Sequence, residues 1–387
     1  MPAAATWIDR PDALAAAADR WQAVAADIAL DTEFVFERTY RPRLGIVQIA
    51  IAGEIALVDA VRIPDLSALG PLLADPARRK LLHSGSGDLP ILRRAGGSAL
   101  RGLLDTQIAA AFAGLGPSLS YAALVKTLLG VELAKHETRT DWLRRPLSPD
   151  QLRYAAEDVE YLPAVAADLE ERLRVLGRLE WALEDSATLA MLDGDTPDPA
   201  VAWRRVKGLD RLNTTSRAVA RALAAWRERE AERADLARPF LLRDETLLAI
   251  AKRDALDPAD AKALPGFDAR RHTHLAPRWA SALQAARAEV EAGIAPPEDP
   301  PTPADVRDRQ DALGVRVAAL VTQKATELGL PGEQLLSRRQ RERVVETWLR
   351  TGGSLAATLG GFRGAVLGAE LDALTIEGDA PAAAVPS

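Results

Sequence analysis

The segment Ile28-Ala29-Leu30-Asp31-Thr32-Glu33-Phe34 is an apolar run that ends in two carboxylates. Its first three residues are apolar, which is typical of a buried β-strand. Successive side chains of a strand point to opposite faces, so Asp31 and Glu33 lie on the same face. Two like charges at this spacing repel each other unless a cation lies between them. We therefore expect a strand that presents two potential metal ligands at its end.

The sequence on either side of this strand predicts a sheet covered by helices. Gly53 separates two strand-like runs, which favours an antiparallel hairpin. Two further short strands follow, and from there to about residue 195 the apolar periodicity is helical. The four additional strand segments are 44–52, 54–60, 80–84 and 103–106. This order predicts an α/β domain with a mixed central sheet flanked by helices.

Two more segments bring carboxylates toward the same edge of the sheet. Asp88 follows a strand and the turn Gly85-Ser86-Gly87, so it can reach the end of the first strand. Further along, Ser148-Pro149-Asp150-Gln151 combines an N-cap serine, a proline at the first helical position and a glutamine in the capping-box position. A helix that begins there carries Tyr154 and Asp158 on one face, because they are four residues apart.

These four acids and the tyrosine together favour metal-dependent phosphodiester chemistry. A single Asp is usually a helix cap or a surface charge, but three separate segments here deliver acid to one edge. Hard oxygen ligands favour Mg²⁺ or Mn²⁺ over zinc, and the sequence contains no cysteine for a thiolate site. Two such ions about 4 Å apart are the usual clamp for in-line displacement at a phosphodiester. The phenol of Tyr154 is placed to orient the attacking water.

The same residues resemble the motifs of the DEDDy group of 3′-5′ exonucleases, and of its ribonuclease D family in particular. The first motif is matched by Asp31-Thr32-Glu33-Phe34, and the second by His83-Ser84-Gly85-Ser86-Gly87-Asp88-Leu89. The third is matched by Tyr154-Ala155-Ala156-Glu157-Asp158-Val159-Glu160-Tyr161-Leu162. The segments 104–107 and 141–147 also resemble the family, and the match spans roughly residues 5–195.

The resemblance implies a ribonuclease-H-like exonuclease fold and a set of catalytic roles. It implies that two divalent metal ions, Mg²⁺ or Mn²⁺, are bound by Asp31, Glu33, Asp88 and Asp158. It implies that Tyr154 positions the nucleophilic water. The expected activity is hydrolysis of RNA from its 3′ end with release of nucleoside 5′-monophosphates, and the expected substrates are precursors of tRNA and other stable RNAs.

Five further residues are candidates for contact with the substrate. Phe34 is placed either to stack on the terminal base or to pack in the core. His83 ends a buried strand, and it is either a neighbour of the active site or a hydrogen-bonded structural histidine. The full set of expected substrate-binding residues is Thr32, Phe34, His83, Lys135 and Arg145.

The chain divides into an exonuclease domain and helical domains. We expect the exonuclease domain over residues 1–195, an HRDC-type all-α domain over 203–290, a second, divergent HRDC-like domain over 304–372 and a disordered tail over 373–387. Residues 201–290 hold 18 Lys and Arg against 12 Asp and Glu, although the net charge of the whole chain is −6. This excess suits either a module that binds a polyanion or a plain solvated surface. The candidate RNA contacts in this segment are Arg204, Arg205, Lys207, Arg270 and Arg271.

The expected partner is RNA with a single-stranded 3′ end. We expect a monomer in the cytoplasm, with no secretory signal and no membrane-spanning segment. Two alternatives remain open from the sequence: an exonuclease that degrades DNA, since the same site cleaves both backbones, and a non-catalytic adaptor that binds RNA through its helical modules.

Overall fold

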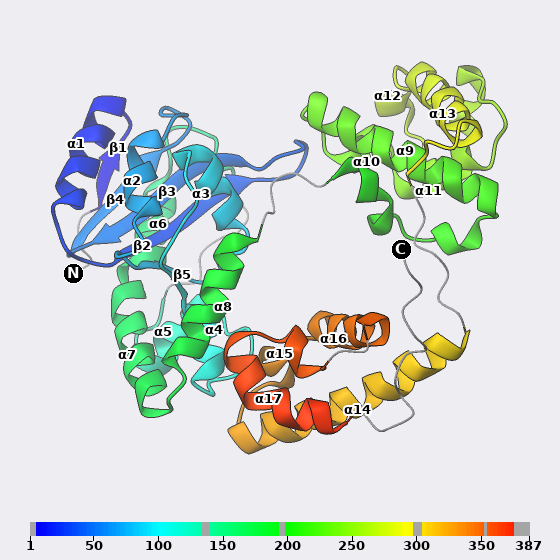
Figure 1. The fold of residues 1–387 in the computed structure, drawn as a ribbon. Helices are drawn as coiled ribbons and strands as arrows, with labels where there is room; N and C mark the ends of the chain where they lie inside the picture. Colours follow the sequence, from blue (N-terminus) through cyan, green and yellow to red (C-terminus); the bar gives the residue numbers. More distant parts are fainter. Residues whose placement is uncertain (1–4, 134–139, 193–197, 297–303, 352–353, 375–387) are drawn as a thin grey trace. The chain divides into compact units, whose positions relative to one another are not determined.

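The computed structural model contains two compact units (Figure 1). Unit 1 comprises residues 1–33, 44–192 and 301–387, and unit 2 comprises residues 34–43 and 193–300. The structure describes residues 5–133, 140–192, 198–296, 304–351 and 354–374. Lys135 and most of the tail expected over residues 373–387 lie outside the described residues.

Unit 1 is built on a six-stranded mixed sheet with the strand order β1-β4-β3-β2-β5-β6 (Figure 1). The strands are β1 Thr6–Ile8, β2 Ile28–Val35, β3 Arg43–Ile51, β4 Glu54–Asp59, β5 Lys80–Leu82 and β6 Leu103–Asp105. β1 pairs with β4 and β5 pairs with both β2 and β6 in parallel, whereas β3 and β4 are antiparallel. The hairpin predicted around Gly53 is confirmed, and this glycine has the positive φ of 83° that the turn between β3 and β4 requires.

Both faces of the sheet are buried, because alternate residues of each strand enter different hydrophobic clusters. Ile28 and Leu30 of β2 pack with the N-terminal helices, whereas Ala29 packs with the later helices. The helices of the first layer are α1 Pro11–Gln22, α2 Gly70–Ala74 and α3 Asp88–Gly96, with the 3-10 turn η1 Ser67–Leu69. The helices of the second layer are α4 Thr106–Phe112, α5 Tyr121–Leu129, α6 Pro149–Glu160 and α7 Leu162–Val175. The predicted α/β fold class is thereby confirmed.

Helix α6 begins where its capping residues predict. Ser148 Oγ accepts from the backbone N–H of Gln151 at 3.1 Å, and the Gln151 side chain accepts from the backbone N–H of Ser148 at 2.9 Å. Pro149 occupies the first helical position, where the missing N–H costs nothing. This cap fixes the register that places Tyr154 and Asp158 one turn apart on the same face.

The C-terminal helices of the chain pack into unit 1. These are α14 Ala304–Leu328, α15 Gly332–Leu335, α16 Arg338–Thr351 and α17 Gly361–Ala373, with the 3-10 turn η5 Ala356–Thr358. Their buried side chains, such as Val317 and Leu367, belong to the same hydrophobic cluster as Leu104 of β6. Helix α8, Leu179–Met191, contacts both β6 and α17. These helices therefore share a core with the exonuclease fold, and their expected likeness to a second HRDC module stays a prediction.

Unit 2 is helical apart from the short segment 34–43. Its helices are η2 Pro199–Arg205, η3 Leu209–Arg211, α9 Thr214–Arg233, α10 Arg238–Leu241, α11 Asp244–Ala251, η4 Pro258–Ala263, α12 Ala269–His272 and α13 Ala276–Glu291. The core forms around α9 and α13, with Trp279 fully buried and its indole N–H donating to the carbonyl of Leu241 at 3.1 Å. Tyr40 from the segment 34–43 joins this core.

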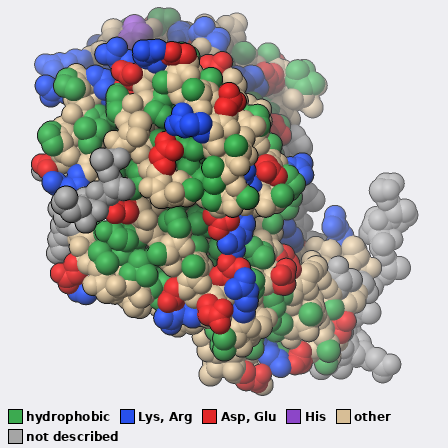
Figure 2. All heavy atoms as spheres, turned by 90° about the vertical axis from the view of Figure 1, so that its left-hand side faces the viewer, with side chains coloured by type: hydrophobic (Ala, Val, Ile, Leu, Met, Phe, Trp, Pro, Cys, Tyr) green, Lys and Arg blue, Asp and Glu red, His purple; other side chains and the backbone are tan. Residues whose placement is uncertain are grey.

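On the face of the molecule drawn in Figure 2, basic and acidic side chains are interspersed with hydrophobic ones. Such mixing is typical of a solvated protein surface. Within the part of the chain that the structure describes, no helix combines the length and apolar character that crossing a bilayer demands.

Candidate active site

The carboxylates predicted from β2 and α6 meet at one place in unit 1. One carboxylate oxygen from each of Asp31, Glu33 and Asp158 lies within 4.8 Å of the others. β2 brings Asp31 and Glu33 to one face by alternation, and α6 lays Asp158 against that face. Oxygens bound to one Mg²⁺ at about 2.1 Å lie at most about 4.2 Å apart, so these three oxygens are close to the spacing that a shared divalent cation requires.

Asp88 reaches the same region from the N-terminus of α3 on the other side of β2. It is buried, and one of its carboxylate oxygens accepts a hydrogen bond from the hydroxyl of Thr32. Thr32 lies between Asp31 and Glu33 and therefore points to the opposite face of the strand. This hydrogen bond explains why Asp88 lies beside the cluster of three rather than inside it.

Burial raises the pKa of each of these four carboxyl groups, and repulsion from neighbouring acids adds to the effect. Burial raises the pKa of Asp31 well above its ordinary value, and the charges of Asp88, Asp158 and Glu33 raise it further. Burial, followed by the charges of Asp158 and Asp88, raises the pKa of Glu33 to about 8. These four acids resist ionisation because they are buried next to one another. A bound cation would stabilise their ionised form and lower their pKa values.

Asp158 and Asp88 show the same effect. Burial raises the pKa of Asp158 to about 7, with a contribution from Glu157. Burial also raises the pKa of Asp88 to about 6, although the hydrogen bond from Thr32 acts in the opposite direction. The Oδ2 atom of Asp158 is buried and has no hydrogen-bond partner among the described residues. An orphaned carboxylate oxygen is costly unless a cation binds it, so the donor set fits a divalent metal ion.

Tyr154 lies one turn before Asp158 and shares its environment. Burial raises the pKa of its phenol, and the charges of Asp158, Glu33 and Asp31 add to the effect. The phenol therefore stays protonated and can act as a hydrogen-bond donor or acceptor toward a water molecule. The ring lies against Trp142, with 6.0 Å between the ring centroids and 36° between the ring planes.

The turn before Asp88 is held by Asp105, a residue that the sequence analysis gave no role. The carboxylate of Asp105 accepts from the backbone N–H groups of Ser84 at 3.2 Å and Gly85 at 2.8 Å. It also caps α4 by accepting from Gln107 at 2.9 Å and Ile108 at 3.2 Å. The N-cap role was detectable, because Asp105 directly precedes a helix, but the contact with the turn depends on the tertiary fold.

Tyr121 is a second residue that the sequence analysis missed. Its hydroxyl donates to the carbonyl of Glu157 at 3.2 Å and accepts from the backbone N–H of Tyr161 at 3.2 Å. These two bonds hold the end of α6 on either side of Asp158. No local sequence signal identifies this contact, since Tyr121 and Glu157 are 36 residues apart.

Arg145 is placed for a structural role rather than for the expected substrate contact. Its guanidinium forms a bidentate pair with Asp59, with Nε to Oδ2 at 2.8 Å and Nη2 to Oδ1 at 2.6 Å. It also donates to the carbonyls of Gly45 and Trp142, at 2.9 and 2.8 Å. Every guanidinium nitrogen therefore already has a partner within the protein.

The remaining expected substrate contacts fall in different places. His83 donates through Nε2 to the carbonyl of Leu119 at 3.0 Å, and its Nδ1 lies 2.9 Å from the hydroxyl of Thr106, which favours a structural role. Thr32 holds Asp88. Phe34, at the end of β2, is half-buried, and its contact with a base stays a prediction.

The mixed sheet and the carboxylate cluster have the features of a metal-dependent nuclease. A family model described as 3′-5′ exonuclease matches residues 5–174, and one described as HRDC domain matches residues 216–283. The chain is 40% identical over 372 residues to ribonuclease D of Xanthomonas oryzae pv. oryzae, covering 94% of this chain and 97% of that protein. It is 36% identical over 379 residues to ribonuclease D of Escherichia coli, covering 96% and 98%.

The crystal structure of Escherichia coli RNase D, described as an exoribonuclease involved in structured RNA processing, matches 96% of this chain and 98% of its own length. The TM-score is 0.84 at 32% sequence identity. This chain belongs to the ribonuclease D family and is a 3′-5′ exoribonuclease, in a family that depends on divalent metal ions.

Proposed function

We propose that Asp31, Glu33, Asp88 and Asp158 hold two divalent ions, Mg²⁺ or Mn²⁺, and that Tyr154 orients the water that attacks the 3′-terminal phosphodiester of RNA. The observation that carries this proposal is the approach of three carboxylate oxygens to within 4.8 Å, with a buried oxygen of Asp158 left without a partner. Asp88 completes the donor set by turning its carboxylate from Thr32 toward Asp31, whose pKa its charge already raises.

The chemistry follows from the donors. When bound, such ions lower the pKa of the attacking water and stabilise the charge on the leaving 3′ oxygen. The raised pKa of Tyr154 keeps its proton in place near neutral pH, so the phenol positions the water by hydrogen bonding instead of removing its proton as a phenolate. Trp142 restricts the ring and thereby fixes the direction of the hydroxyl.

The substrates that we propose are the single-stranded 3′ ends of structured RNAs, including tRNA precursors. The support is the likeness over nearly the whole chain to an exoribonuclease involved in structured RNA processing. A cytoplasmic location suits an RNA substrate and a sequence free of cysteine. The monomeric state stays a prediction.

A tRNA precursor labelled at its 5′ end tests the site, the directionality and the substrate class together. With Mg²⁺, wild type is expected to shorten the RNA stepwise from the 3′ end, and Asp158→Asn is expected to reduce kcat by about 10³-fold or more, since a lost ligand removes transition-state stabilisation. The matched control is Asp150→Asn on the same helix, whose carboxylate is 77% exposed and pairs only with Arg153 among the described residues. EDTA is expected to abolish cleavage.

Three outcomes would contradict the proposal. They are activity that persists in EDTA, an Asp158→Asn variant as active as Asp150→Asn, and products released from the 5′ end. A DNA strand of the same sequence, digested in parallel, measures the preference for RNA.

A further inference from the structure

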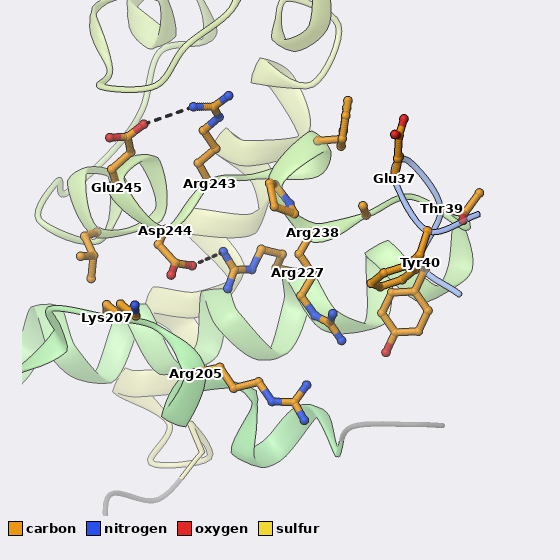
Figure 3. A pocket seen from close by; sticks show the side chains of 15 residues that line it. Glu37, Thr39, Tyr40, Arg205, Lys207, Arg227, Arg238, Arg243, Asp244 and Glu245 are labelled. Carbon is orange, nitrogen blue, oxygen red and sulfur yellow. Dashed lines mark hydrogen bonds and ion pairs between the residues drawn. The ribbon is translucent and has the colours of Figure 1, made fainter. Parts of the chain in front are cut away.

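Unit 2 contains a cavity of about 770 Å³ that the exonuclease chemistry does not use (Figure 3). One wall is formed by the segment 34–43, and the others by η2 with the residues after it, α10 and α11. The volume lies within the range of about 300–1,000 Å³ that is typical of small-ligand pockets. Pockets of this size accept a molecule such as a nucleotide.

The wall from the segment 34–43 is anchored by specific contacts within unit 2. The Tyr40 hydroxyl donates to Glu228 Oε1 at 2.5 Å, and the Tyr40 backbone N–H donates to Asp235 Oδ1 at 3.1 Å. The guanidinium of Arg238 lies 4.9 Å from the centre of the Tyr40 ring and pairs with Glu228. These contacts fix Tyr40 and Arg238 in the wall of the pocket, and both are held by the buried carboxylate of Glu228.

The pocket is basic, and part of its positive charge is available to a ligand. Five cationic and three acidic side chains line it. Arg227 forms an ion pair with Asp244 at 2.7 Å, and Arg238 forms one with Glu228. By contrast, Lys207 is exposed and makes no ion pair within 4.0 Å among the residues that the structure describes. In the view of Figure 3, Arg205, Arg227 and Arg238 lie between Lys207 and Tyr40.

Aromatic rings stand beside these cations. Phe36 is 55% exposed, which is unusual for a large apolar side chain. Phe240 lines the same pocket, and the guanidinium of Arg271 lies 4.8 Å from the centre of its ring. One exposed and one half-buried aromatic ring next to lysine and arginine form the combination that binds single-stranded nucleic acid, by stacking on the bases and by attraction of the phosphates.

We propose that this pocket binds one nucleotide of the single-stranded RNA substrate, upstream of the 3′ end that is being hydrolysed. Lys207 and Arg205 hold its phosphate, and its base stacks on Phe36 or Phe240. This proposal rests on RNA being the substrate. The pocket would be a second RNA contact besides the catalytic site. The segment 34–43 and the helices of unit 2 both contribute to it.

The test compares wild type, Lys207→Glu and Phe240→Ala, each as the full chain. The matched control is Lys262→Glu, because Lys262 is an exposed lysine of the same unit that does not line the pocket. Affinity for an unstructured, labelled 12-nucleotide RNA is measured by fluorescence anisotropy in EDTA, so that no cleavage occurs. Steady-state hydrolysis of the same RNA and of a trinucleotide is then measured with Mg²⁺.

Lys207→Glu and Phe240→Ala are each expected to raise the Kd for the 12-nucleotide RNA about tenfold, the order expected for one lost stacking or phosphate contact. KM for that RNA rises in parallel, whereas kcat and trinucleotide hydrolysis keep their wild-type values. Lys207→Gln is expected to reduce the slope of log Kd against log salt concentration by about 0.7, the value for one phosphate contact with a single strand.

Equal losses for Lys207→Glu and Lys262→Glu, or wild-type Kd values for both pocket variants, would overturn the proposal. Thermal melting of each variant excludes unfolding as the cause. If Phe240→Ala does not fold, Lys207→Glu still decides the question, since its side chain is exposed. A wild type that binds the 12-nucleotide RNA but hydrolyses neither RNA would point to failure of the catalytic assignment and not of the pocket.

Discussion

The carboxyl groups of Glu33, Asp158 and Asp88 are held at pKa values of about 8, 7 and 6 in the absence of a cation. Each value lies above the ordinary one, so the folded protein retains protons that the unfolded chain has already released. The free energy of unfolding of the metal-free protein therefore falls as the pH rises from about 4 to about 8. Below about pH 4 the carboxyl groups are protonated in both the folded and the unfolded state. The stability that is lost at higher pH is therefore fully present there.

This reasoning predicts that the Tm of wild type in EDTA decreases from pH 5 to pH 8, and that Mg²⁺ or Mn²⁺ restores it most strongly at pH 8. Glu33→Gln removes one of the titrating groups, so its Tm is expected to depend less steeply on pH and to respond less to the metal. Differential scanning calorimetry at several pH values measures the slope of Tm against pH for wild type and for Glu33→Gln. Parallel slopes for wild type and Glu33→Gln would show that the cluster does not titrate as described.

At the level of single residues, the sequence identified the acids but not what holds them. Asp31, Glu33 and Asp158 follow from strand alternation and helical spacing, which are local rules, and they meet as expected. The hydrogen bond from Thr32 to Asp88 joins residues 56 positions apart in the sequence, on the face of β2 opposite to Asp31 and Glu33. Contacts of this kind depend on the tertiary fold, so no periodicity in the sequence contains them.

Among the elements of unit 1, the segment before α6 depends on the ion pair between Arg145 and Asp59. Asp59 ends β4, and its side chain is 1% exposed. The pair joins the segment that carries Trp142 to β3 and β4, and Trp142 packs on Tyr154. Gly45 allows the close approach, because a Cβ there would lie 2.6 Å from the carbonyl oxygen of Trp142.

Arg145→Met is therefore expected to destabilise the protein by about 3–5 kcal/mol, because the buried Asp59 loses its counter-charge and keeps only the backbone N–H groups of Val61 and Arg62 as donors. Combining it with Asp59→Asn is expected to recover part of this loss. Where the variant is folded, kcat should fall more than KM rises, since Tyr154 loses its support but no contact with RNA is removed. Urea unfolding and steady-state kinetics provide the measurements.

Arg153→Met is the matched control, because Arg153 is exposed on α6 and its pair with Asp150 contributes about 0–1 kcal/mol. If Arg145→Met raised KM at unchanged stability, Arg145 would be the substrate contact that the sequence analysis expected. The start of α6, by contrast, was predictable, because Ser148, Pro149 and Gln151 encode the cap within four residues.

At the scale of the whole molecule, the C-terminal helices lie in the same compact unit as the exonuclease fold, and the expected HRDC-like domain over residues 304–372 stays a prediction. A helical period indicates that α14, α16 and α17 are amphipathic without indicating which surface they cover. The surface is α8 and its neighbours: Phe362 of α17 stacks on Trp181 at 4.9 Å and meets Phe112 edge-on at 5.3 Å. Arg363 pairs with Asp185 of α8.

Phe362→Ala is accordingly expected to destabilise unit 1 by about 3–5 kcal/mol, the usual cost of removing a buried aromatic ring. Phe362 is 6% exposed and packs on two other aromatic rings, so its removal leaves a cavity that neighbouring side chains fill only in part. Val315→Ala on α14 is the control, because that side chain is 70% exposed and its loss should change stability by less than about 0.5 kcal/mol. Exonuclease activity reports on unit 1, whereas denaturant unfolding followed by tryptophan fluorescence reports on both units, because Trp203, Trp226 and Trp279 lie in unit 2. An independent domain of α14 to α17 would predict that Phe362→Ala leaves the thermal inactivation of the exonuclease unchanged.

Because these helices share one hydrophobic core with the sheet, we expect Phe362→Ala to inactivate at a lower temperature than wild type. The control Val315→Ala is expected to inactivate at the wild-type temperature.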